Sequence, residues 1–407
     1  MEELGIYIHI PFCKQKCFYC DFCSFANKNE MQGKYVETVI NEIKNITHKE
    51  KYTVTTIYLG GGTPSILNPD YIKNILQEIK SSFEILDDAE ITIEINPGTV
   101  NEEKLKKYKE YGINRLSIGL QSANDKILKK IGRIHDYKQF EETFFYARKC
   151  GFKNINVDLM IGLEKFISAG YSLESSKRAI DLADKYEFIY TTVGISPNDV
   201  KQTLEKIIQK NPEHISVYSL IIEEGTIIEK LINENKLQLP DEETERIMYW
   251  TVVNELKENG YNQYEISNFS KKTYESKHNT NCWKQKQYIG LGTSAHSYLN
   301  KKRYSNTNNI EEYIKNIQEN NISKNITIHE EQTEESTMNE YMLLGLRMIQ
   351  GININEFKQK FKIDPTIKYK EILEKLQKEN LIQITKTSIK LTKQGINFGN
   401  IVWEEFI

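Results

Sequence analysis

The chain has 407 residues, and its 54 Lys and Arg nearly balance its 57 Asp and Glu, for a formal net charge of −3 at pH 7. Composition therefore gives no reason to expect nucleic acid as a partner. The length predicts a large domain plus a smaller one, with a core that folds without disulfides or structural metals. The acidic N-terminus lacks a signal-peptide pattern, and no apolar run reaches the ~20 residues that span a bilayer. We expect a cytoplasmic protein with reduced thiols and leave peripheral membrane contact open.

Residues 1–220 alternate short strand-like runs with helical runs, a pattern typical of parallel βα units. The predicted strands are 6–10, 56–59, 91–96, 116–121, 155–160 and 215–220, with helices such as 35–46, 71–83, 104–111 and 140–150 between them.

The two faces of these strands differ in polarity. On the first strand Ile6, Ile8 and Ile10 share one face, and Tyr7 and His9 share the other. A parallel sheet covered on both faces would be apolar throughout, whereas polar groups near the carboxyl strand ends mark the active-site side of a βα barrel. Half-solvated antiparallel strands are the alternative, but helices separate nearly every pair. We predict an α/β fold, a partial (βα)6 TIM-like barrel with a polar lumen.

The rest of the chain predicts two further parts. Residues 1–240 form the barrel, and residues 241–330 form a linking region with a helix at 242–259 and an aromatic, Asn- and Gly-rich stretch. Residues 331–407 predict a smaller α-rich domain that resembles a winged-helix unit. Its predicted helices are 335–348, 355–361 and 367–379, and its strands are 381–385 and 388–391. Because no basic recognition face accompanies it, packing or partner docking is a better interpretation than DNA binding.

Cys13, Cys17 and Cys20 lie within eight residues, directly after the first predicted strand. Three thiolates on one short loop can hold three irons of a [4Fe-4S] cluster and leave the fourth open to a cofactor or substrate. A disulfide is disfavoured in a reducing compartment. A zinc site that includes Cys23 is the alternative, although such sites usually draw on two separated cysteine pairs. Cys23 is then a bystander or accessory thiol, and Cys150 a small buried hydrophobe.

The second predicted strand ends in three glycines, Gly60 to Gly62, followed by Thr63 and Pro64. Such a run lets the backbone approach a ligand closely and exposes its amides and carbonyls. Taken alone, the run is equally compatible with a tight turn. Its place at a strand end beside the cysteine loop favours the ligand interpretation.

The cysteine spacing, the glycine run and Glu94-Ile-Asn-Pro97 together resemble the radical S-adenosylmethionine (SAM) enzymes. The resemblance implies that the open iron chelates the amino and carboxylate groups of SAM. It further implies that the glycine motif contacts the amino group, and that the acidic residue of the third strand contacts the ribose or methionyl part.

Four further segments, at 7–13, 115–121, 131–135 and 157–159, are similar to oxygen-independent coproporphyrinogen III oxidases and their relatives. For Arg133 and Asp158 the alternative is a structural ion pair or a helix cap. The cofactor-site residues that the resemblance implies are Tyr7, Tyr19, Gly62, Thr63, Pro64, Glu94, Gln121, Arg133 and Asp158.

Two branches of that family differ in sequence. The oxidases carry an N-terminal extension before the Tyr7 motif and a cysteine at the position of Phe22. The heme-chaperone (HemW-type) branch starts directly at this strand and carries a His-Asn-x-x-Tyr-Trp signature. This chain has His278-Asn-Thr-Asn-Cys-Trp283, and it therefore resembles the heme-chaperone branch.

His278 is the leading candidate for heme contact, because imidazole ligates heme iron and an indole such as Trp283 stacks on the macrocycle. The alternative is a polar turn whose side chains satisfy loop backbone groups. Cys282 replaces the expected tyrosine, and a small-for-large replacement is favoured over thiolate ligation. The second-rank ligand candidates are His9, His135 and His296.

Residues 164–199 depart from the family pattern and resemble part of a TatD-type metal-dependent nuclease. Ser196 and Asn198 stand where that family has histidines, so no nuclease metal site is expected. We predict an inserted αβ unit beside the pocket.

The favoured function is a heme chaperone that binds heme, passes it to heme-accepting proteins and takes electrons for its cluster from a donor. An oxidase that decarboxylates coproporphyrinogen III is the enzymatic alternative, and a scaffold disabled by the insertion is the third. The sequence leaves open whether the protein is an enzyme.

Overall fold

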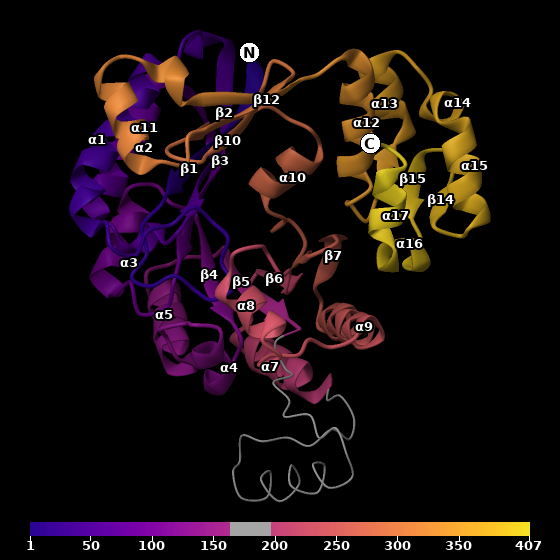
Figure 1. Cartoon of the computed structure of the whole chain (residues 1–407), viewed down its shortest axis with the longest axis horizontal. Helices are drawn as coiled ribbons and strands as arrows, with labels where there is room; N and C mark the ends of the chain where they lie inside the picture. The colour runs from indigo at the N-terminus through magenta and orange to yellow at the C-terminus, as the bar shows by residue number, and fades with distance from the viewer. Residues whose placement is uncertain (163–196) are drawn as a thin grey trace, which may run out of the picture.

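The computed structural model describes residues 1–162 and 197–407 of the chain (Figure 1). The inserted unit predicted at 164–199 lies outside the described residues, apart from its last three positions, which begin helix α7 (Pro197–Lys210). Its resemblance to a nuclease fragment stays a prediction.

A sheet of twelve strands forms the core of the larger part, and six parallel strands lie at its centre. The six are adjacent in chain order, and each predicted strand overlaps one of them. They are β1 (Glu2–Ile10), β2 (Tyr52–Gly61), β3 (Glu84–Ile95), β4 (Arg115–Gln121), β5 (Ile155–Ile161) and β6 (His214–Ser219). β1 and β6 pair with other strands and not with each other, so the barrel is open. The predicted partial (βα)6 barrel is confirmed.

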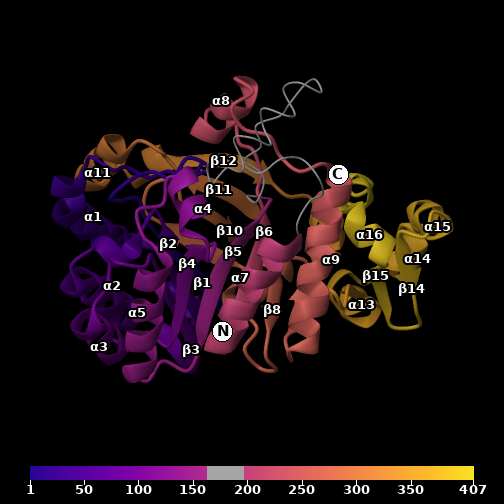
Figure 2. The same ribbon diagram turned by 90° about the horizontal axis from the view of Figure 1, so that it is seen from below.

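Helices cover the outer face of the six strands (Figure 2). The aliphatic strand face packs beneath them, and Ile6, Ile8 and Ile10 have no exposed surface. Local caps set where these helices begin: Asn68 accepts a bond from a first-turn amide, and Asp136 forms a capping box with Gln139. The helices on this face are α1 (Gln32–Asn45), α2 (Pro69–Ser82), α3 (Glu102–Glu110), α5 (Tyr137–Lys149) and α7. α4 (Asp125–Lys130) instead packs in a separate cluster with Phe18 and Tyr19 of the cysteine loop.

The predicted linking region extends the sheet at both edges. β9 (Tyr288–Leu291) pairs in parallel with β1, and β10 (His296–Leu299), β11 (Lys302–Asn306) and β12 (Ile326–Glu331) continue from it. At the other edge β8 (Asn268–Ser270) pairs with β6, and β7 (Asn262–Glu265) follows. α8 (Ile227–Asn233) precedes this region, whose helices are α9 (Glu242–Glu258), α10 (Lys277–Trp283) and α11 (Ile310–Gln318).

The C-terminal part is rich in helix and has a hydrophobic cluster of its own, which includes Phe357 and Leu376. The predicted helix at 367–379 is interrupted at Tyr369. Its elements are α12 (Glu334–Gly345), β13 (Ile352–Asn353), α13 (Ile354–Phe361), α14 (Pro365–Lys368), α15 (Lys370–Lys378), β14 (Ile382–Ile384), β15 (Ser388–Leu391), α16 (Lys393–Asn397) and α17 (Gly399–Glu404). The predicted α-rich C-terminal part is confirmed, and the domain boundaries at 240 and 330 stay predictions.

Short 3₁₀ helices complete the described elements: η1 (Asn29–Met31), η2 (Lys49–Lys51), η3 (Pro64–Ile66) and η4 (Ile322–Asn325). Within the described ranges, none of the helices has the length and apolar composition that crossing a membrane requires.

Candidate functional site

The cysteine loop follows β1 at the carboxyl ends of the parallel strands. Its two arms join at the base, where the Cys13 N–H donates to the Phe25 carbonyl at 3.0 Å. Its middle is tied to the segment after α4, because the Phe18 N–H donates to the Ile131 carbonyl at 2.9 Å. Protein contacts alone therefore hold the loop against the barrel.

Cys13 is buried, and Cys17 and Cys20 are half-buried. Burial raises the pKa of the Cys13 thiol, and it raises the pKa of Cys20 to about 11. Both thiols carry protons at neutral pH until a metal displaces them. In a four-iron cluster each thiolate binds a different iron, so the ligands need not converge on one point.

The glycine run at the end of β2 packs directly against this loop. The Gly62 N–H donates to the Ile10 carbonyl at 2.9 Å, and the Thr63 N–H donates to the Phe12 carbonyl at 2.8 Å. A Cβ atom at Gly62 would stand 2.8 Å from the Phe12 oxygen and 3.0 Å from the Cys13 sulfur. The Thr63 hydroxyl lies 3.5 Å from the same sulfur. Glycine is required here because the backbone and the thiol approach each other so closely.

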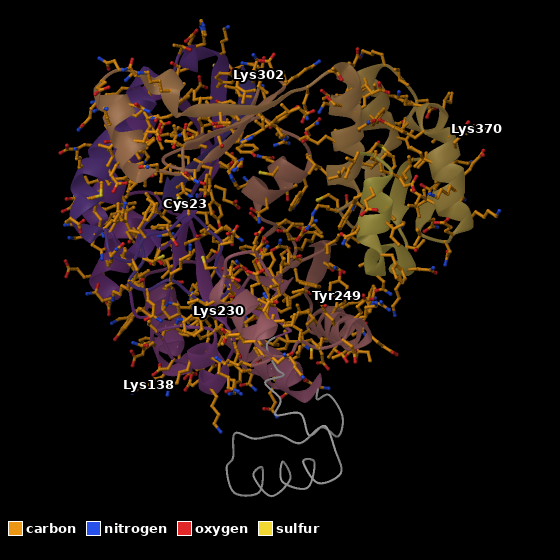
Figure 3. The ribbon with its side chains drawn as sticks, viewed as in Figure 1. Cys23, Lys138, Lys230, Tyr249, Lys302 and Lys370 are labelled. Carbon is orange, nitrogen blue, oxygen red and sulfur yellow. The ribbon has the colours of Figure 1, made fainter. Side chains whose placement is uncertain are left out.

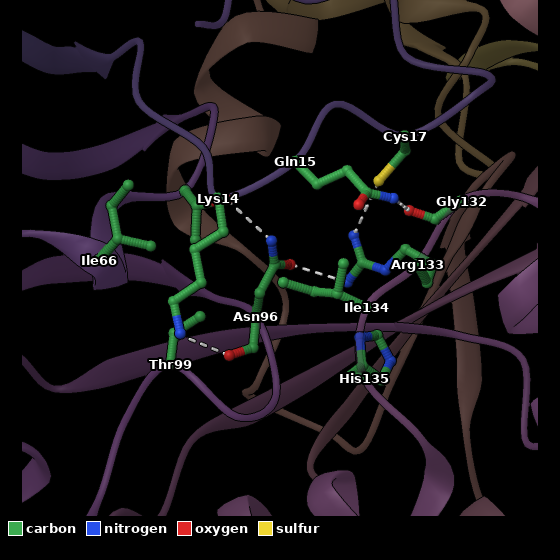
Figure 4. Close-up of a pocket in the computed structure, with 11 residues that line it drawn as sticks. Lys14, Gln15, Cys17, Ile66, Asn96, Thr99, Gly132, Arg133, Ile134 and His135 are labelled. Carbon is green, nitrogen blue, oxygen red and sulfur yellow. Dashed lines mark hydrogen bonds between the residues drawn. The ribbon is translucent and has the colours of Figure 1, made fainter. Parts of the chain in front are cut away.

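Arg133 and Asn96 connect the cysteine loop to the strand ends (Figure 4). Arg133 Nη2 donates to Asn96 Oδ1 at 2.8 Å, and Nη1 lies 3.6 Å from the Cys17 sulfur. Asn96 Nδ2 in turn donates to Thr63 Oγ1 at 2.8 Å. Arg133 Nε is buried without a partner among the described residues, which leaves a donor for a bound group. The pocket beside these residues is lined by Lys14, Gln15, Cys17, Thr63, Ile66, Asn96, Thr99, Gly132, Arg133, Ile134 and His135.

Asn96 was not among the residues predicted for the site. It follows Glu94 by two positions, directly after the end of β3 at Ile95, and that spacing was the available signal. Two predicted residues border the same place: Tyr19 lies beside Cys17, and Pro64 is buried at the start of η3.

Glu94 lies further down the lumen from the glycine run. Its Oε1 accepts from the Tyr58 hydroxyl at 2.8 Å, and its Oε2 accepts from the Gly61 N–H at 3.2 Å. Burial, with the nearby Asp158 carboxylate, raises the pKa of Glu94 to about 7. Among the described residues no cation contributes to that shift. A carboxylate in this setting suits a ligand that brings a positive charge.

Gln121 stands at the end of β4 with a left-handed backbone, φ +73°, just after a shift in the strand register. Such a bulge turns a side chain away from its regular direction. A Cβ atom at Gly119 would lie 3.2 Å from Gln121 Nε2 and 3.3 Å from Arg133 Nη2, so these two predicted side chains meet above Gly119.

Asp158 belongs to a polar network that fills the lower lumen. Its carboxylate accepts from Ser117 Oγ at 2.9 Å and from Asn156 Nδ2 at 2.7 Å. Asn156 Oδ1 lies 2.7 Å from His214 Nδ1, and His214 Nε2 lies 2.8 Å from the Tyr264 hydroxyl. Neither the ion pair with Arg133 nor the helix cap is the role that the structure gives Asp158.

His278, on α10, reaches into this lower lumen. Its Nδ1 lies 2.9 Å from Thr56 Oγ1, and its ring stacks on Tyr58 with centroids 5.2 Å apart. Tyr58 also stacks on Tyr7, so a row of rings joins the predicted heme residue to a predicted cofactor residue. His278 is 7% exposed, and burial lowers its pKa to about 4. The imidazole is therefore neutral at pH 7 but shielded from solvent.

Trp283 and Cys282, at the end of the same motif, lie in different surroundings. Trp283 follows His278 by five positions, which is about 140° around a helix. Its indole is covered by the guanidinium of Arg347 at 4.5 Å, and the same guanidinium lies 5.1 Å from the Trp403 ring. Burial raises the pKa of the Cys282 thiol to about 11, so it is protonated at neutral pH. The structure does not bring the indole and the His278 imidazole together.

Two of the second-rank histidines have structural partners. His9 Nδ1 lies 3.0 Å from the Tyr7 hydroxyl, and its Nε2 lies 2.8 Å from the Cys23 carbonyl. His135 Nε2 lies 3.3 Å from the Leu120 carbonyl, and burial lowers the pKa of His135 to about 3. These contacts place both rings in supporting roles beside the loop.

Cys23, labelled in Figure 3, is half-buried, and its sulfur lies 3.5 Å from the Asn308 carbonyl. Cys150, predicted to be a small buried hydrophobe, is half-buried and packs against the main hydrophobic core. Its thiol lies 3.6 Å from the Glu102 carbonyl.

Two family models match parts of the chain. A family model described as the radical SAM superfamily matches residues 7–166, and one described as the HemN C-terminal domain matches residues 332–398. Among solved structures, coproporphyrinogen III oxidase (HemN) from Escherichia coli, described as a radical SAM enzyme, aligns with a TM-score of 0.80 and 20% identity over 100% of this chain and 90% of that one. At that identity the likeness shows the fold alone.

Curated relatives are similar over nearly the whole chain. The heme chaperone HemW of Bacillus subtilis is 35% identical over 403 residues, with 98% of each protein covered. The heme chaperone HemW of Lactococcus lactis is 33% identical over 402 residues, covering 98% of this chain and 96% of the relative.

Proposed function

Since this chain belongs to the heme chaperone HemW family of radical SAM proteins, we propose that it binds heme and passes it to heme-accepting proteins. The similarity to these relatives over 98% of the chain is the observation that carries the proposal. It spans the cysteine loop, the linking strands and the C-terminal part together.

Radical SAM proteins carry a [4Fe-4S] cluster and SAM, and the residues of this chain fit both. Cys13, Cys17 and Cys20 would hold the cluster, with Gly62 giving the Cys13 sulfur its room. Glu94, which lacks a cation among the described residues, suits the positively charged SAM. When bound, the cluster supplies an electron to its ligand.

The partners of the proposed cycle are a heme-accepting protein and an electron donor for the cluster, and the proposed location is the cytoplasm. The predicted heme contact at His278 stays a prediction. Its imidazole is neutral, which is the form that ligates iron, but α10 would have to move for heme to reach it.

A heme titration tests the proposed function. Purified protein is mixed with ferric heme under anaerobic conditions, and binding is followed by the change in heme absorbance. The proposed function predicts saturable binding and transfer of the bound heme to an apo-acceptor such as apomyoglobin. Absence of binding at micromolar protein would reject it.

Coproporphyrinogen oxidation is the second candidate, because the residues proposed to hold the cofactor, Gly62, Thr63 and Arg133, lie together at one end of the lumen. Deoxyadenosine release and decarboxylated product with coproporphyrinogen III would select it. The inactive-scaffold alternative predicts that reconstituted protein holds no more iron than a Cys17→Ala variant.

A further inference from the structure

The helix that carries His278, α10, is attached to the rest of the fold chiefly through polar contacts. His278 is the one buried residue among its seven. The hydrophobic clusters that the described residues form include no side chain of α10. Helices of globular proteins are usually held in place by an apolar face packed against the core. The position of α10 depends instead on hydrogen bonds, which protein and water groups exchange at a modest net cost.

Glu90, on β3, holds the N-terminal end of α10. Its Oε2 accepts from the Lys277 N–H at 3.1 Å, and its Oε1 accepts from the His278 N–H at 3.1 Å. Both amides lie in the first turn, so the helix itself offers them no acceptor. A charged acceptor makes such bonds about twice as strong as neutral ones. Glu90 is 5% exposed, so water competes little for these bonds, and its carboxylate fixes where His278 enters the lumen.

Arg115, on β4, offers the same carboxylate a second partner. Its Nε is buried and makes no hydrogen bond to any residue that the structure describes. That atom lies 3.9 Å from Glu90 Oε2, close enough for an ion pair but too far for a hydrogen bond. A buried donor without an acceptor is unfavourable. If α10 leaves its place, the Glu90 carboxylate loses two donors and becomes free to accept from Arg115 Nε, which offsets part of the cost of that movement.

Left-handed backbone flanks α10 on both sides. Thr273, before the helix, has φ +75°, and Gln285, after it, has φ +53°. This region is strained for a β-branched residue such as threonine, and strain of this kind is common in segments that change conformation. Gln285 is anchored, because its Nε2 donates to the Thr337 carbonyl at 3.0 Å and to Glu340 Oε2 at 2.8 Å, both on α12. Thr273 is exposed, so the segment is fixed at its C-terminal end and able to turn at the other.

We infer that α10 is a hinged segment that carries His278 out of the lumen to heme, and that Glu90 is the positioning residue that holds it closed. In the closed arrangement, which the structure shows, Glu90 bonds to α10 and the His278 ring lies on Tyr58. In the open arrangement Glu90 pairs with Arg115, and His278 reaches solvent. The inference rests on the proposed function, because heme is the ligand that favours the open arrangement by binding it alone.

Hydrogen exchange of residues 274–284 tests the closed arrangement in cluster-loaded, heme-free protein. Glu90→Gln leaves one acceptor oxygen for two amides, so exchange in this segment is expected to become about tenfold faster or more. Arg115→Met removes the second partner of Glu90 and is expected to slow exchange severalfold. Asp88→Asn is the matched control, because it removes only the exposed ion pair with Lys277, at 2.7 Å, and is expected to stay within about twofold of wild type.

Stopped-flow mixing with ferric heme, followed by absorbance, tests the link to binding. If α10 must open first, the association rate of wild type levels off as the heme concentration rises. Glu90→Gln is expected to raise that limiting rate about tenfold, and Asp88→Asn to leave it within about twofold. A carboxylate that only capped the helix would change hydrogen exchange but not this rate. In the heme complex, residues 274–284 are expected to exchange faster than in heme-free protein, whereas a ligand bound to the closed form would slow them.

The outcomes separate the inference from the proposed function. If Glu90→Gln exchanges no faster than Asp88→Asn, Glu90 does not hold α10 and the inference fails. If wild type binds heme at a rate that rises in proportion to its concentration, and Glu90→Gln leaves that rate unchanged, binding does not wait for α10, so the inference fails and the proposed function stands. If wild type binds no heme while exchange follows the expected order, the proposed function fails and the hinge at α10 stands. Circular dichroism and iron content show that each variant has folded.

Discussion

Replacement of Gly62 by alanine tests how the cysteine loop is built. The added methyl group would stand 2.8 Å from the Phe12 oxygen, 3.0 Å from the Cys13 sulfur and 3.1 Å from the Ile10 oxygen. Both carbonyls already accept hydrogen bonds from this strand end, so they retreat only if those bonds break. The Cys13 sulfur is the atom left to move, and it is a proposed iron ligand.

Ordinary contacts between such atoms begin near 3.5 Å, so the neighbours must give way by roughly 0.5 Å. Overpacking of this kind costs about 1–3 kcal/mol in the free energy of unfolding. A displaced support of a metal ligand lowers metal affinity by about 10- to 100-fold. We predict that Gly62→Ala lowers the stability of the cluster-free protein by about 2 kcal/mol and reduces its iron content after reconstitution.

Urea unfolding of the cluster-free protein measures the first effect, and iron and sulfide per chain after anaerobic reconstitution measure the second. Gly33→Ala is the control, because its Cβ atom would meet only the end of the Tyr71 side chain, at 2.9 Å. If Gly62→Ala retains wild-type iron and unfolds within about 0.5 kcal/mol of wild type, the close approach is not required and the reasoning is refuted.

Three further predictions follow from the lumen and the loop. Burial raises the pKa of Glu94 from 4.5 to about 7. Between these two pH values the folded protein keeps a proton that the unfolded chain releases. The free energy of unfolding of the cofactor-free protein should therefore fall as the pH rises from 4.5 to about 7. In a plot of the urea midpoint of unfolding against pH, Glu94→Gln should remove this fall in stability. The exposed control Glu110→Gln should leave the plot unchanged. If the Glu94→Gln and wild-type curves are parallel, Glu94 is not the group that causes the fall. Burial raises the pKa of the Cys13 and Cys20 thiols, so cluster assembly must remove their protons. We therefore predict that the initial rate of iron uptake rises between about pH 7 and 9. A rate that does not change with pH would show that ionisation of the thiols does not limit assembly. Tyr264→Phe removes the hydroxyl that contacts His214 Nε2, and we predict a loss of about 1–2 kcal/mol in unfolding free energy, whereas no loss would mean that water replaces the hydroxyl.

Much of the barrel could be predicted from the chain, because its signals are local. The alternation of Ile6, Ile8 and Ile10 with Tyr7 and His9 distinguishes the core face from the lumen face without knowledge of any neighbour. All six central strands overlap their predicted positions for the same reason.

The strands of the linking region were missed because they are short. β9 is only four residues long, and it becomes a strand by pairing with β1, whose residues come some 280 positions earlier. Pairing of that range leaves no periodic signal in either segment. Asn96 and Tyr58 were missed for a related reason, since their roles depend on the register between neighbouring strands.

The cysteine loop was readable in the sequence because its three thiols and their spacing lie within eight residues. Whether a histidine is open to a ligand is a different kind of property. His278 stands in a recognisable motif, yet the packing of α10 against β2 buries its ring on Tyr58. His296 was only a second-rank candidate in the sequence, and the order of β10, β11 and β12 brings its exposed ring against that of His329. The cluster loop could be identified from the sequence because its ligands lie in one short segment. The exposure of a side chain, and contacts between residues far apart in the sequence, depend on long-range strand pairing and are fixed only in the folded protein.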